Sequence, residues 1–306
     1  MSREDLINKF LNNRSYLKNG ANYLASIWNV DPNEVRIARK KTKLILLEKE
    51  VDEDSDKEFR RMFFDIETSY NVIADFSCGY NKSIGPHQIL RERGIICICW
   101  KWEGEDKVHY LKWDDNQCDK KMLIEFTKEL EKADEAIGHN GDKFDLRWLR
   151  GRAIIHQVPF PTYVKSLDTL KKVRSAGYFN SNKLDYLAKI LLGYGKVDTG
   201  GFQLWVDICE KKCKTAMHKM ITYCKNDVVI LEEVFEKLSP YITHNTHVGA
   251  AKGNNKHSCK ACGSDNISFK KNVFTQTGNI QKLVECTDCG TDFKLSNAVW
   301  KKYLKS

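Results

Sequence analysis

Hydrophobic and polar positions follow two different periodicities along the chain, and the pattern is densest between residues 60 and 240. Strands are predicted where β-branched and aromatic residues gather, at 62–66, 95–102 and 108–113. Helices and one short strand follow: a helix at 120–132, a strand at 135–139, and helices at 144–152, 183–192 and 218–238. This order predicts an α/β domain in which a mixed sheet is flanked by helices.

The first 44 residues predict a small helical module. An amphipathic stretch at 23–29 is interrupted by Val30-Asp31-Pro32, where Asp31 can cap a second helix and Pro32 suits its first position. Helix, tight turn and basic second helix resemble a helix-turn-helix. We therefore expect nucleic-acid contact from the basic residues of the second helix, with a plain helical cap as the alternative. These residues are Arg36, Arg39, Lys40 and Lys41.

Two polar segments indicate the domain boundaries. Residues 48–58 are almost all charged, and 241–256 are small and polar without periodicity. We expect a charged linker at 45–58, with a helix end as the alternative for 48–58, and a flexible connector at 241–256. The predicted organisation is a helical module at 1–44, an α/β domain at 59–240 and a small cysteine-containing module at 257–306.

Charge and composition narrow the class of partner. The 306 residues carry a formal net charge of +9, and residues 246–306 alone hold ten Lys, no Arg and four acids, a net charge of +6. Such basic segments favour a polyanion, most often nucleic acid, although solubility explains surface lysines equally well. The chain begins without an apolar signal core and has no apolar run as long as a membrane span. We expect a cytoplasmic protein without a membrane partner.

The segment Phe63-Phe64-Asp65-Ile66-Glu67-Thr68 places two acids in a predicted strand. Side chains two apart lie on one face of a strand, so Asp65 and Glu67 would be neighbours while Phe64 and Ile66 face a core. Adjacent carboxylates repel unless a cation lies between them or one is protonated. Oxygen ligands of this kind suit magnesium or manganese. A half-exposed edge strand with ordinary surface acids is the alternative.

Two further segments supply acids, one at the start of a predicted helix and one on the face of another. His139-Asn140-Gly141-Asp142-Lys143-Phe144-Asp145 lies where a strand gives way to a helix. Tyr223 and Asp227 are four apart in a predicted helix and therefore share a face. Taken singly, Asp145 could be a first-turn acid that the helix dipole favours, and Asp227 a surface charge.

As an ordered set, these motifs resemble the DEDD superfamily of 3′→5′ exonucleases, in its tyrosine subgroup. Asp65-x-Glu67 matches the first motif, the Asn140 to Phe144-Asp145 segment the second, and Tyr223-x-x-x-Asp227 the third. The resemblance covers residues 59–240 and implies a ribonuclease H-like fold. It also implies metal-dependent hydrolysis of nucleic acid from 3′ ends.

The resemblance also implies roles and partners. Asp65 would bridge two Mg²⁺ or Mn²⁺ ions, Glu67 and Asp227 would complete the first site, and Asp145 would hold the second. Tyr223 would orient the attacking water, and Asn140 and Phe144 would place the 3′ end. Single-stranded DNA or DNA 3′ ends are the favoured substrate, and any proofreading would serve a separate polymerase, replication or repair protein. An exoribonuclease using the same site and a non-catalytic nucleic-acid-binding adaptor are the alternatives.

Four of the eleven cysteines form two Cys-x-x-Cys pairs, Cys259/Cys262 and Cys286/Cys289. Each pair is followed by glycine, and in a reducing compartment this spacing predicts one structural, four-coordinate zinc ion in a zinc ribbon. Iron–sulfur and disulfide chemistry are the alternatives. The lysines of this module, with Phe269, Phe274 and Phe293, could bind single strands. A protein-docking ribbon is the competing interpretation.

Overall fold

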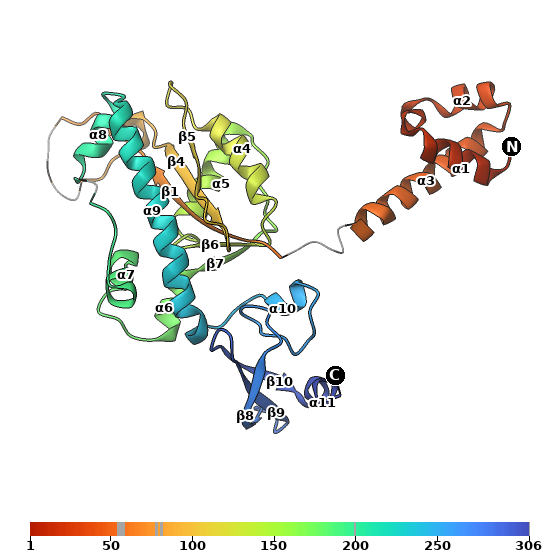
Figure 1. Cartoon of the computed structure of the whole chain (residues 1–306). Helices are drawn as coiled ribbons and strands as arrows, with labels where there is room; N and C mark the ends of the chain where they lie inside the picture. Colours follow the sequence, from red (N-terminus) through yellow and green to blue (C-terminus); the bar gives the residue numbers. More distant parts are fainter. Residues whose placement is uncertain (54–58, 77–78, 80–81, 199, 306) are drawn as a thin grey trace. The chain divides into compact units, whose positions relative to one another are not determined.

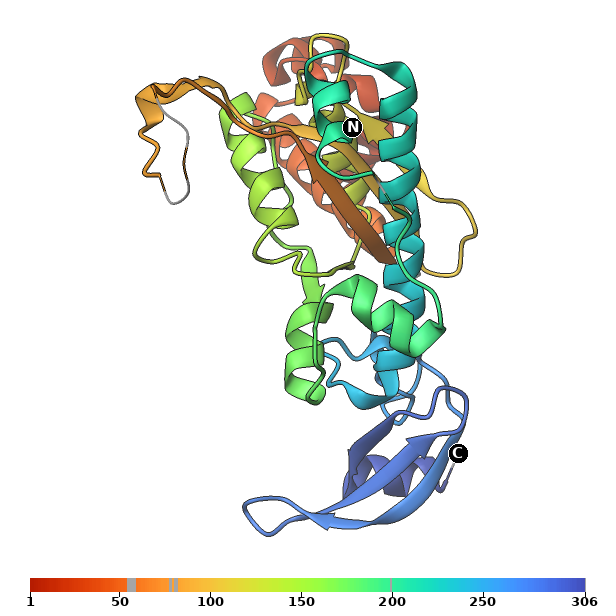
Figure 2. The same cartoon turned by 90° about the vertical axis from the view of Figure 1, so that its left-hand side faces the viewer.

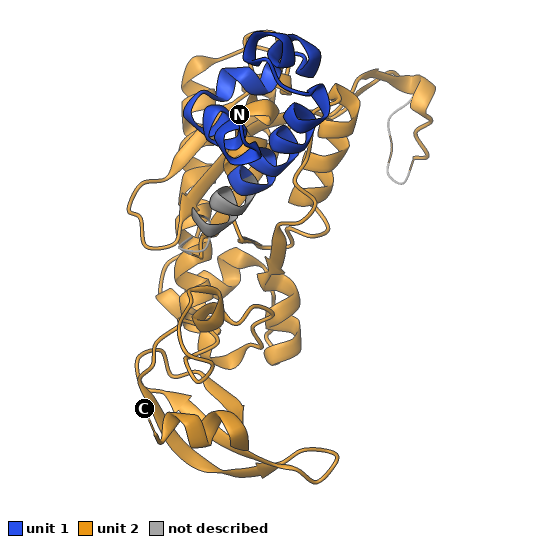
Figure 3. Cartoon of the chain, turned by 90° about the vertical axis from the view of Figure 1, so that its right-hand side faces the viewer, with its two compact units in different colours: residues 1–58 blue, residues 59–306 orange. Residues whose placement is uncertain are grey.

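The protein forms two compact units, residues 1–58 and 59–306 (Figure 3). Its structure is a computed structural model, and it describes residues 1–53, 59–76, 79, 82–198 and 200–305 (Figure 1). Within these residues no helix is both long and apolar enough to cross a membrane.

The first unit is helical. It contains α1 (Arg3–Asn12), η1 (Arg14–Lys18), α2 (Ala21–Trp28) and α3 (Pro32–Glu53). Buried side chains from all three α-helices, including Phe10, Leu24 and Val35, form its core. As predicted, Pro32 is the first residue of α3, and Oδ1 of Asp31 accepts a hydrogen bond of 2.7 Å from the Asn33 amide.

Helix α3 is longer than the sequence suggested. We expected the helical module to end at residue 44 and a charged linker to cover 45–58, but the helix continues to Glu53. Glutamate and lysine are good helix formers, and neither glycine nor proline occurs between residues 33 and 58 to stop the helix. The rest of the expected linker, 54–58, lies outside the described residues.

The second unit is built on a five-stranded mixed sheet with strand order β5-β4-β1-β6-β7. The central strand β1 pairs antiparallel with β4 and parallel with β6. The outer strand β5 is antiparallel to β4, whereas β7 is parallel to β6. The strands are β1 (Arg61–Thr68), β4 (Ile95–Trp102), β5 (His109–Lys112), β6 (Glu135–Gly138) and β7 (Lys165–Asp168). A small hairpin, β2 (Val72–Ile73) with β3 (Ile89–Arg91), stands apart, and the turn η3 (Pro86–Gln88) lies in its loop.

Helices cover both faces of the sheet, which confirms the predicted fold class. One face packs against the long helix α9 (Figure 2), together with α7 and α8, and the opposite face packs against α4 and α5. Strand β1 is buried on both sides because Phe63 faces the first layer and Phe64 the second. The helices are α4 (Lys120–Leu130), α5 (Asp145–His156), α6 (Thr169–Ala176), α7 (Leu184–Leu192), α8 (Gln203–Cys209) and α9 (Lys214–Leu238).

The segment 241–256, expected to be a flexible connector, is instead packed against the α/β domain. It follows the turn η4 (Ser239–Tyr241) and contains the short helix α10 (Val248–Ala251). The Thr246 hydroxyl donates a 3.0 Å hydrogen bond to Oε1 of Glu135 in β6, and Lys172 Nζ donates to the Thr243 carbonyl at 2.6 Å. Small polar residues can form an ordered segment where their polar groups find partners in this way.

The cysteine module is a three-stranded antiparallel sheet with strand order β10-β9-β8. It comprises β8 (Ile267–Phe274), β9 (Ile280–Cys286), β10 (Asp292–Ser296) and the helix α11 (Asn297–Tyr303). A side chain of the central sheet holds the module: Nη1 of Arg61 in β1 donates to the Ala261 carbonyl at 3.2 Å, and Nε of Arg61 pairs with Glu135 at 2.8 Å. Ala261 lies between Cys259 and Cys262, so this contact ties the first cysteine pair to β1.

Candidate active site and metal centres

The second half of strand β1 presents two carboxylates on one face. Asp65 and Glu67 point to the same side as Phe63, toward α9, while Phe64 and Ile66 belong to the core on the other side. The predicted alternation of this strand is therefore correct. A buried strand tolerates the two acids because they lie at its carboxyl end, where side chains of α9 and the α7–α8 loop meet them.

Helix α9 brings the third acid. One carboxylate oxygen each from Asp65, Glu67 and Asp227 lies within 4.8 Å of the others. Asp227 is only 1% exposed, and its buried Oδ1 has no hydrogen-bond partner. A buried carboxylate oxygen without a partner is costly, and a divalent cation would satisfy it. The donor set is therefore suited to Mg²⁺ or Mn²⁺.

Asp145 lies beside this cluster but is not one of its three members. It is the first residue of α5 and is 3% exposed, and its Oδ1 accepts a 3.2 Å hydrogen bond from the Ile66 amide. Because Ile66 lies between Asp65 and Glu67, this bond fixes Asp145 against the strand that carries both acids. One oxygen of Asp145 is thus used in positioning.

Burial and mutual repulsion make the four acids hold protons more tightly than usual. Burial, followed by the charges of Asp145, Glu67 and Asp227, raises the pKa of Asp65 well above its ordinary value. Burial raises the pKa of Glu67 to about 8 and that of Asp145 to about 7. Perturbation of this size is characteristic of functional sites, and a bound cation would reverse it by favouring the ionised form.

A lysine that no sequence motif indicated also lies in this cluster. Nζ of Lys196, from the loop between α7 and α8, lies 2.5 Å from Oδ2 of Asp227 and 3.4 Å from the Tyr223 hydroxyl. Burial disfavours its charge, but the carboxylates of Asp227 and Asp65 outweigh burial and raise the pKa of Lys196. Lys196 lies between Gly195 and Val197 in a short loop without periodicity, so only its proximity in the fold reveals it.

A cavity of about 480 Å³ opens beside Glu67. Its lining includes the aromatic residues Phe144, Phe202 and Trp205 and the cation Arg93. The guanidinium of Arg93 lies 5.4 Å from the Phe144 ring centroid, and the Trp205 indole nitrogen donates to the Thr68 carbonyl at 3.1 Å. Trp205 and Phe202 come from a segment that the sequence did not indicate, because α8 is too short to show a clear helical period.

The other residues of the second motif have separate environments. Asn140 does not line this cavity; it has a left-handed backbone with φ of 67°, and its amide donates to Oδ1 of Asp168 at 3.0 Å. Asp168 is the N-cap of α6. Its side chain therefore joins the start of α6 to the turn that leads into α5.

The basic residues expected to contact nucleic acid differ in availability. Lys40 and Lys41 are exposed, and Arg36 donates to Oδ1 of Asn33 at 2.7 Å. Arg39 is partly buried, donates to the Asn19 carbonyl and lies over the Phe10 ring. The guanidinium of Arg39 thus holds the fold of the first unit together, which counts against a role for it in contacting nucleic acid.

The four cysteines of the second unit converge. Their Sγ atoms lie within 4.8 Å of one another, with 3.6 Å between Cys259 and Cys289 and between Cys262 and Cys286. A tetrahedral zinc ion with Zn–S bonds of about 2.3 Å requires Sγ separations of about 3.8 Å. Cys259 and Cys286 are buried, and Gly263 and Gly290, which follow the two pairs, have positive φ. The cluster fits a structural zinc ion.

Comparison with known proteins finds a superfamily model that matches part of the second unit. Residues 90–239 match the family model of the RNase H superfamily, a range that includes Asp145, Tyr223 and Asp227 and begins after Asp65 and Glu67. The sheet and its helices therefore form an RNase H-like domain, as predicted. No curated protein matches the chain.

Among solved structures, the chain is similar to the family B DNA polymerase from the hyperthermophilic archaeon Pyrobaculum calidifontis. The identity is 16% and the TM-score is 0.45, and the match covers 60% of this chain. It covers 25% of the polymerase chain, so the similarity spans about a quarter of that protein.

Proposed function

We propose that the protein is a metal-dependent 3′→5′ exonuclease that hydrolyses phosphodiester bonds at the 3′ ends of nucleic acid, with single-stranded DNA favoured. The observation that carries this proposal is the convergence of Asp65, Glu67 and Asp227 within 4.8 Å, around a buried carboxylate oxygen that has no partner. The RNase H-like fold supports a nucleic-acid substrate. Tyr223, one helical turn from Asp227, supports the tyrosine form of the site.

The chain would contribute ligands, orientation and charge. Asp65 would bridge two divalent cations, with Glu67 and Asp227 completing one site and Asp145 holding the other. When bound, such cations would supply activation of an attacking water and stabilisation of the leaving 3′ oxygen. Burial, with Asp227 as the next cause, raises the pKa of Tyr223, so its hydroxyl remains protonated and can donate a hydrogen bond to orient that water.

The cavity beside Glu67 is proposed to hold the terminal nucleotide. Its aromatic side chains, Phe144, Phe202 and Trp205, offer flat surfaces on which a base can stack, and Arg93 offers a cation for a phosphate. Stacking of this kind tolerates any base, which suits an enzyme that shortens strands of varied sequence. We propose that Asn140 helps to place the 3′ end through the turn it forms rather than by lining the cavity.

The end modules are proposed to increase affinity for the strand. In the first unit, Lys40 and Lys41 on α3 are exposed and would supply contacts of the helix-turn-helix type. In the cysteine module, Phe274 is 71% and Phe269 is 48% exposed, whereas Phe293, which we expected beside them, is buried in the core of the module. Phe269 and Phe274 are thus the aromatic residues available for stacking.

The test is a cleavage assay with 5′-end-labelled single-stranded DNA and RNA of the same sequence, in Mg²⁺, Mn²⁺ or EDTA. The wild type is expected to give a ladder that shortens from the 3′ end only with a divalent ion. Asp65→Ala should abolish the ladder, whereas Asp142→Ala, which removes a nearby acid outside the cluster, should not. A 3′-blocked oligonucleotide should resist cleavage and so establish polarity.

Other outcomes have distinct meanings. Faster shortening of RNA would make the protein an exoribonuclease that uses the same four acids, since these residues do not contact the 2′-hydroxyl in the proposed arrangement. Binding of both strands without cleavage in either metal would overturn the enzymatic function and favour an adaptor.

A further inference from the structure

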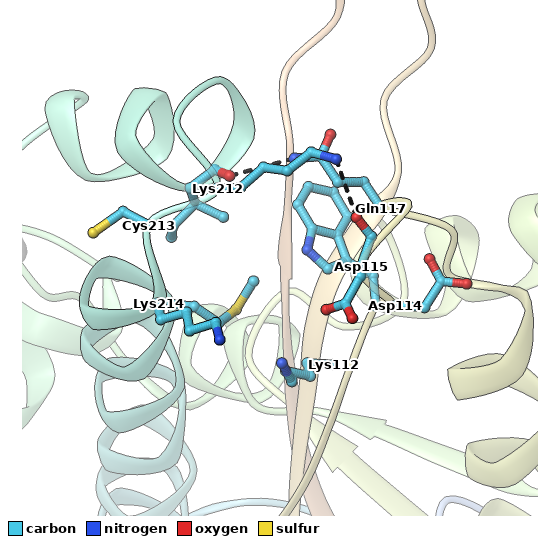
Figure 4. A pocket seen from close by; sticks show the side chains of 10 residues that line it. Lys112, Asp114, Asp115, Gln117, Lys212, Cys213 and Lys214 are labelled. Atoms are coloured by element: carbon cyan, nitrogen blue, oxygen red, sulfur yellow. Dashed lines mark hydrogen bonds between the residues drawn. The ribbon is translucent and has the colours of Figure 1, made fainter.

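A second cavity lies on the same side of the sheet as the acids, at the edge strand. It has a volume of about 500 Å³ and lies between the end of β5 and the start of α9 (Figure 4). Lys112 lines it from the strand side and Lys214 from the helix side (Figure 4), and Trp113 and Met217 are among its other lining residues. A shallower hollow, of about 530 Å³, shares Lys214 and continues along α9 past His218 and Lys219 to Thr222.

Strand register places this cavity relative to the acidic cluster. Glu67 pairs with Cys97, and Cys97 pairs with Lys112, so the three residues form one row across β1, β4 and β5. Directly paired residues lie on the same face of a sheet. With strands about 4.8 Å apart, the backbone of Lys112 lies about 10 Å from that of Glu67.

Helix α9 links the two sites more directly. Lys219 precedes Tyr223 by four residues, and Tyr223 precedes Asp227 by four, so all three lie along one stripe of the helix. Nζ of Lys219 lies 3.5 Å from the point that a Cβ atom on Gly200 would occupy, beside the loop that carries Lys196. From Tyr223 to Lys214 the helix rises about 13.5 Å at 1.5 Å per residue.

The walls of the cavity are held by reciprocal hydrogen bonds. Lys212 donates from Nζ to the Asp115 carbonyl at 3.1 Å, and Gln117 donates from Nε2 to the Ile208 carbonyl at 3.3 Å (Figure 4). Nε2 of Gln117 also donates to the Cys209 carbonyl at 2.8 Å. Lys212 and Gln117 both have positive φ, at 50° and 61°. Non-glycine residues adopt this conformation only where their surroundings enforce it. The cavity is therefore preformed.

Three lysine ammonium groups lie along this path. Lys112, Lys214 and Lys219 are exposed and make no ion pair within the part of the chain that the structure describes. Two carboxyl groups also line the cavity. Oδ1 of Asp114 is already used in accepting from the Asn116 and Cys118 amides, both at 2.9 Å, whereas the Asp115 carboxylate faces the cavity and opposes a polyanion.

We propose that Lys219, Lys214 and Lys112 form a phosphate-binding track for the strand upstream of its 3′ end. The inference rests on the proposed exonuclease function, because it takes the acidic cluster as the position of the terminal phosphodiester. The 13.5 Å from Tyr223 to Lys214 corresponds to at most about four nucleotides at the axial spacing of about 3.4 Å that one strand has in a duplex, and to fewer in an extended single strand. A strand of eight nucleotides would reach all three lysines, whereas a dinucleotide would reach none beyond the terminal site.

The experiment measures binding separately from cleavage. A 5′-fluorescein oligothymidylate of eight nucleotides is titrated with the full-length protein in EDTA, and anisotropy gives the Kd at several salt concentrations. The variant is Lys112→Ala/Lys214→Ala/Lys219→Ala. The control is Lys120→Ala/Lys121→Ala/Lys128→Ala, which removes the same charge from exposed positions on α4, a helix that packs on the opposite face of the sheet.

Each single-strand phosphate contact contributes a salt slope of about 0.7, or about fivefold in affinity at 0.1 M salt. The track variant should therefore bind about 100-fold more weakly, with a salt slope smaller by about 2. The control should change both quantities much less. Asp115→Asn, which removes the opposing charge and leaves the lysines intact, should tighten binding. In Mg²⁺, cleavage of a dinucleotide should be the same in the wild type and the track variant.

Equal losses of affinity in the track and control variants would overturn the track, as would unchanged or weaker binding by Asp115→Asn. Neither result depends on turnover. The absence of cleavage in the wild type would instead count against the exonuclease function, and it would leave the binding comparison intact.

Discussion

Nζ of Lys196 lies 2.5 Å from Oδ2 of Asp227, inside the cluster of acids that fits a divalent cation. The side chain of Asp227 is 2% exposed and that of Lys196 is 25% exposed, so the pair is largely shielded from water. A buried carboxylate needs a compensating positive charge. In the metal-free protein Lys196 supplies that charge, and it lies within reach of the Tyr223 hydroxyl as well.

Replacement of Lys196 by methionine should therefore destabilise the metal-free protein. Removal of one partner from a buried pair costs about 3–5 kcal/mol in general. Protonation of Asp227, whose pKa burial already raises, would reduce that cost. We expect urea unfolding in EDTA to show a loss of about 1–3 kcal/mol. Mg²⁺ should restore part of the loss by supplying the missing charge.

The matched control for this prediction is Lys189→Met, which removes a lysine paired with Asp185 on the surface of α7 at 2.6 Å. Both side chains of that pair are more than a third exposed, so its loss should change stability by less than about 0.5 kcal/mol. Equal effects of the two substitutions would contradict the role assigned to Lys196.

Glu67 should make the metal-free protein less stable as pH rises. Its pKa is raised by burial from 4.5 to about 8 in the folded protein, so the folded state holds a proton that the unfolded state has already released in this range. Stability therefore falls between about pH 4.5 and pH 8. Glu67→Gln keeps a neutral side chain of similar shape at every pH. In EDTA it should be more stable than the wild type at pH 8, by at least about 1 kcal/mol, and similar at pH 4.5.

Urea unfolding at the two pH values measures this difference. Glu125→Gln, which changes an exposed acid on α4, controls for loss of charge alone. Two results would show that the burial of Glu67 does not cause the pH dependence of stability. In one, Glu125→Gln changes this pH dependence as much as Glu67→Gln does; in the other, Glu67→Gln leaves it unchanged. Addition of Mg²⁺ should remove the penalty at pH 8, because a bound cation favours the ionised carboxylate.

The parts of the site that the sequence predicted are those fixed by strong local periodicity. Asp65 and Glu67 alternate with apolar residues in one strand, and this alternation shows which face of the strand each side chain occupies. Tyr223 and Asp227 lie four apart in a long amphipathic helix. Each pair follows from one element alone. That the two pairs meet depends on the packing of α9 on β1, which only the family resemblance anticipated.

The parts that were missed belong to short elements and loops. β7 and β10 have four and five residues and α8 has seven, too few for a clear period. Lys196 and Trp205 reach the site from the loop after α7 and from α8, where nothing in the sequence relates them to the acids. The length of α3 was underestimated for a different reason: the charged run was assigned to a linker, although glutamate and lysine also favour helix.

The cysteine cluster predicts one zinc ion per chain and a module that depends on it. With about fifty residues the module has a small core, so the metal should supply much of its folding free energy. A strong chelator should release one equivalent of zinc and make residues 257–305 sensitive to protease. Cys286→Ser should have the same effect without chelator. Cys118→Ser, which changes a cysteine outside the cluster, should not.

Metal analysis and limited proteolysis together test this prediction. If metal analysis found iron instead of zinc and the protein absorbed visible light, the centre would be an iron site with the same structural role. A module that stayed resistant to protease after complete removal of metal would show that its folding does not depend on the ion.

The first unit should be separable from the rest of the chain. Residues 1–58 and 59–306 form compact units with their own cores, so the fragment 59–306 should unfold with the thermal midpoint of the corresponding transition in the whole chain. Cleavage of a dinucleotide by this fragment should match that of the full chain, because all four acids and Tyr223 remain. Affinity for a longer strand should fall if Lys40 and Lys41 contact phosphates, by about 25-fold at 0.1 M salt for two such contacts.

Two double variants of the full chain distinguish a contribution of Lys40 and Lys41 to affinity from a contribution of the whole first unit. Lys40→Ala/Lys41→Ala should reproduce the loss of affinity seen on deletion, whereas Arg14→Ala/Lys18→Ala removes the same charge from the exposed turn η1 and should not. If both double variants lost affinity equally, the unit would act through its net charge. If deletion left affinity unchanged, α3 would have no part in binding the strand, and a helical cap would be its remaining interpretation.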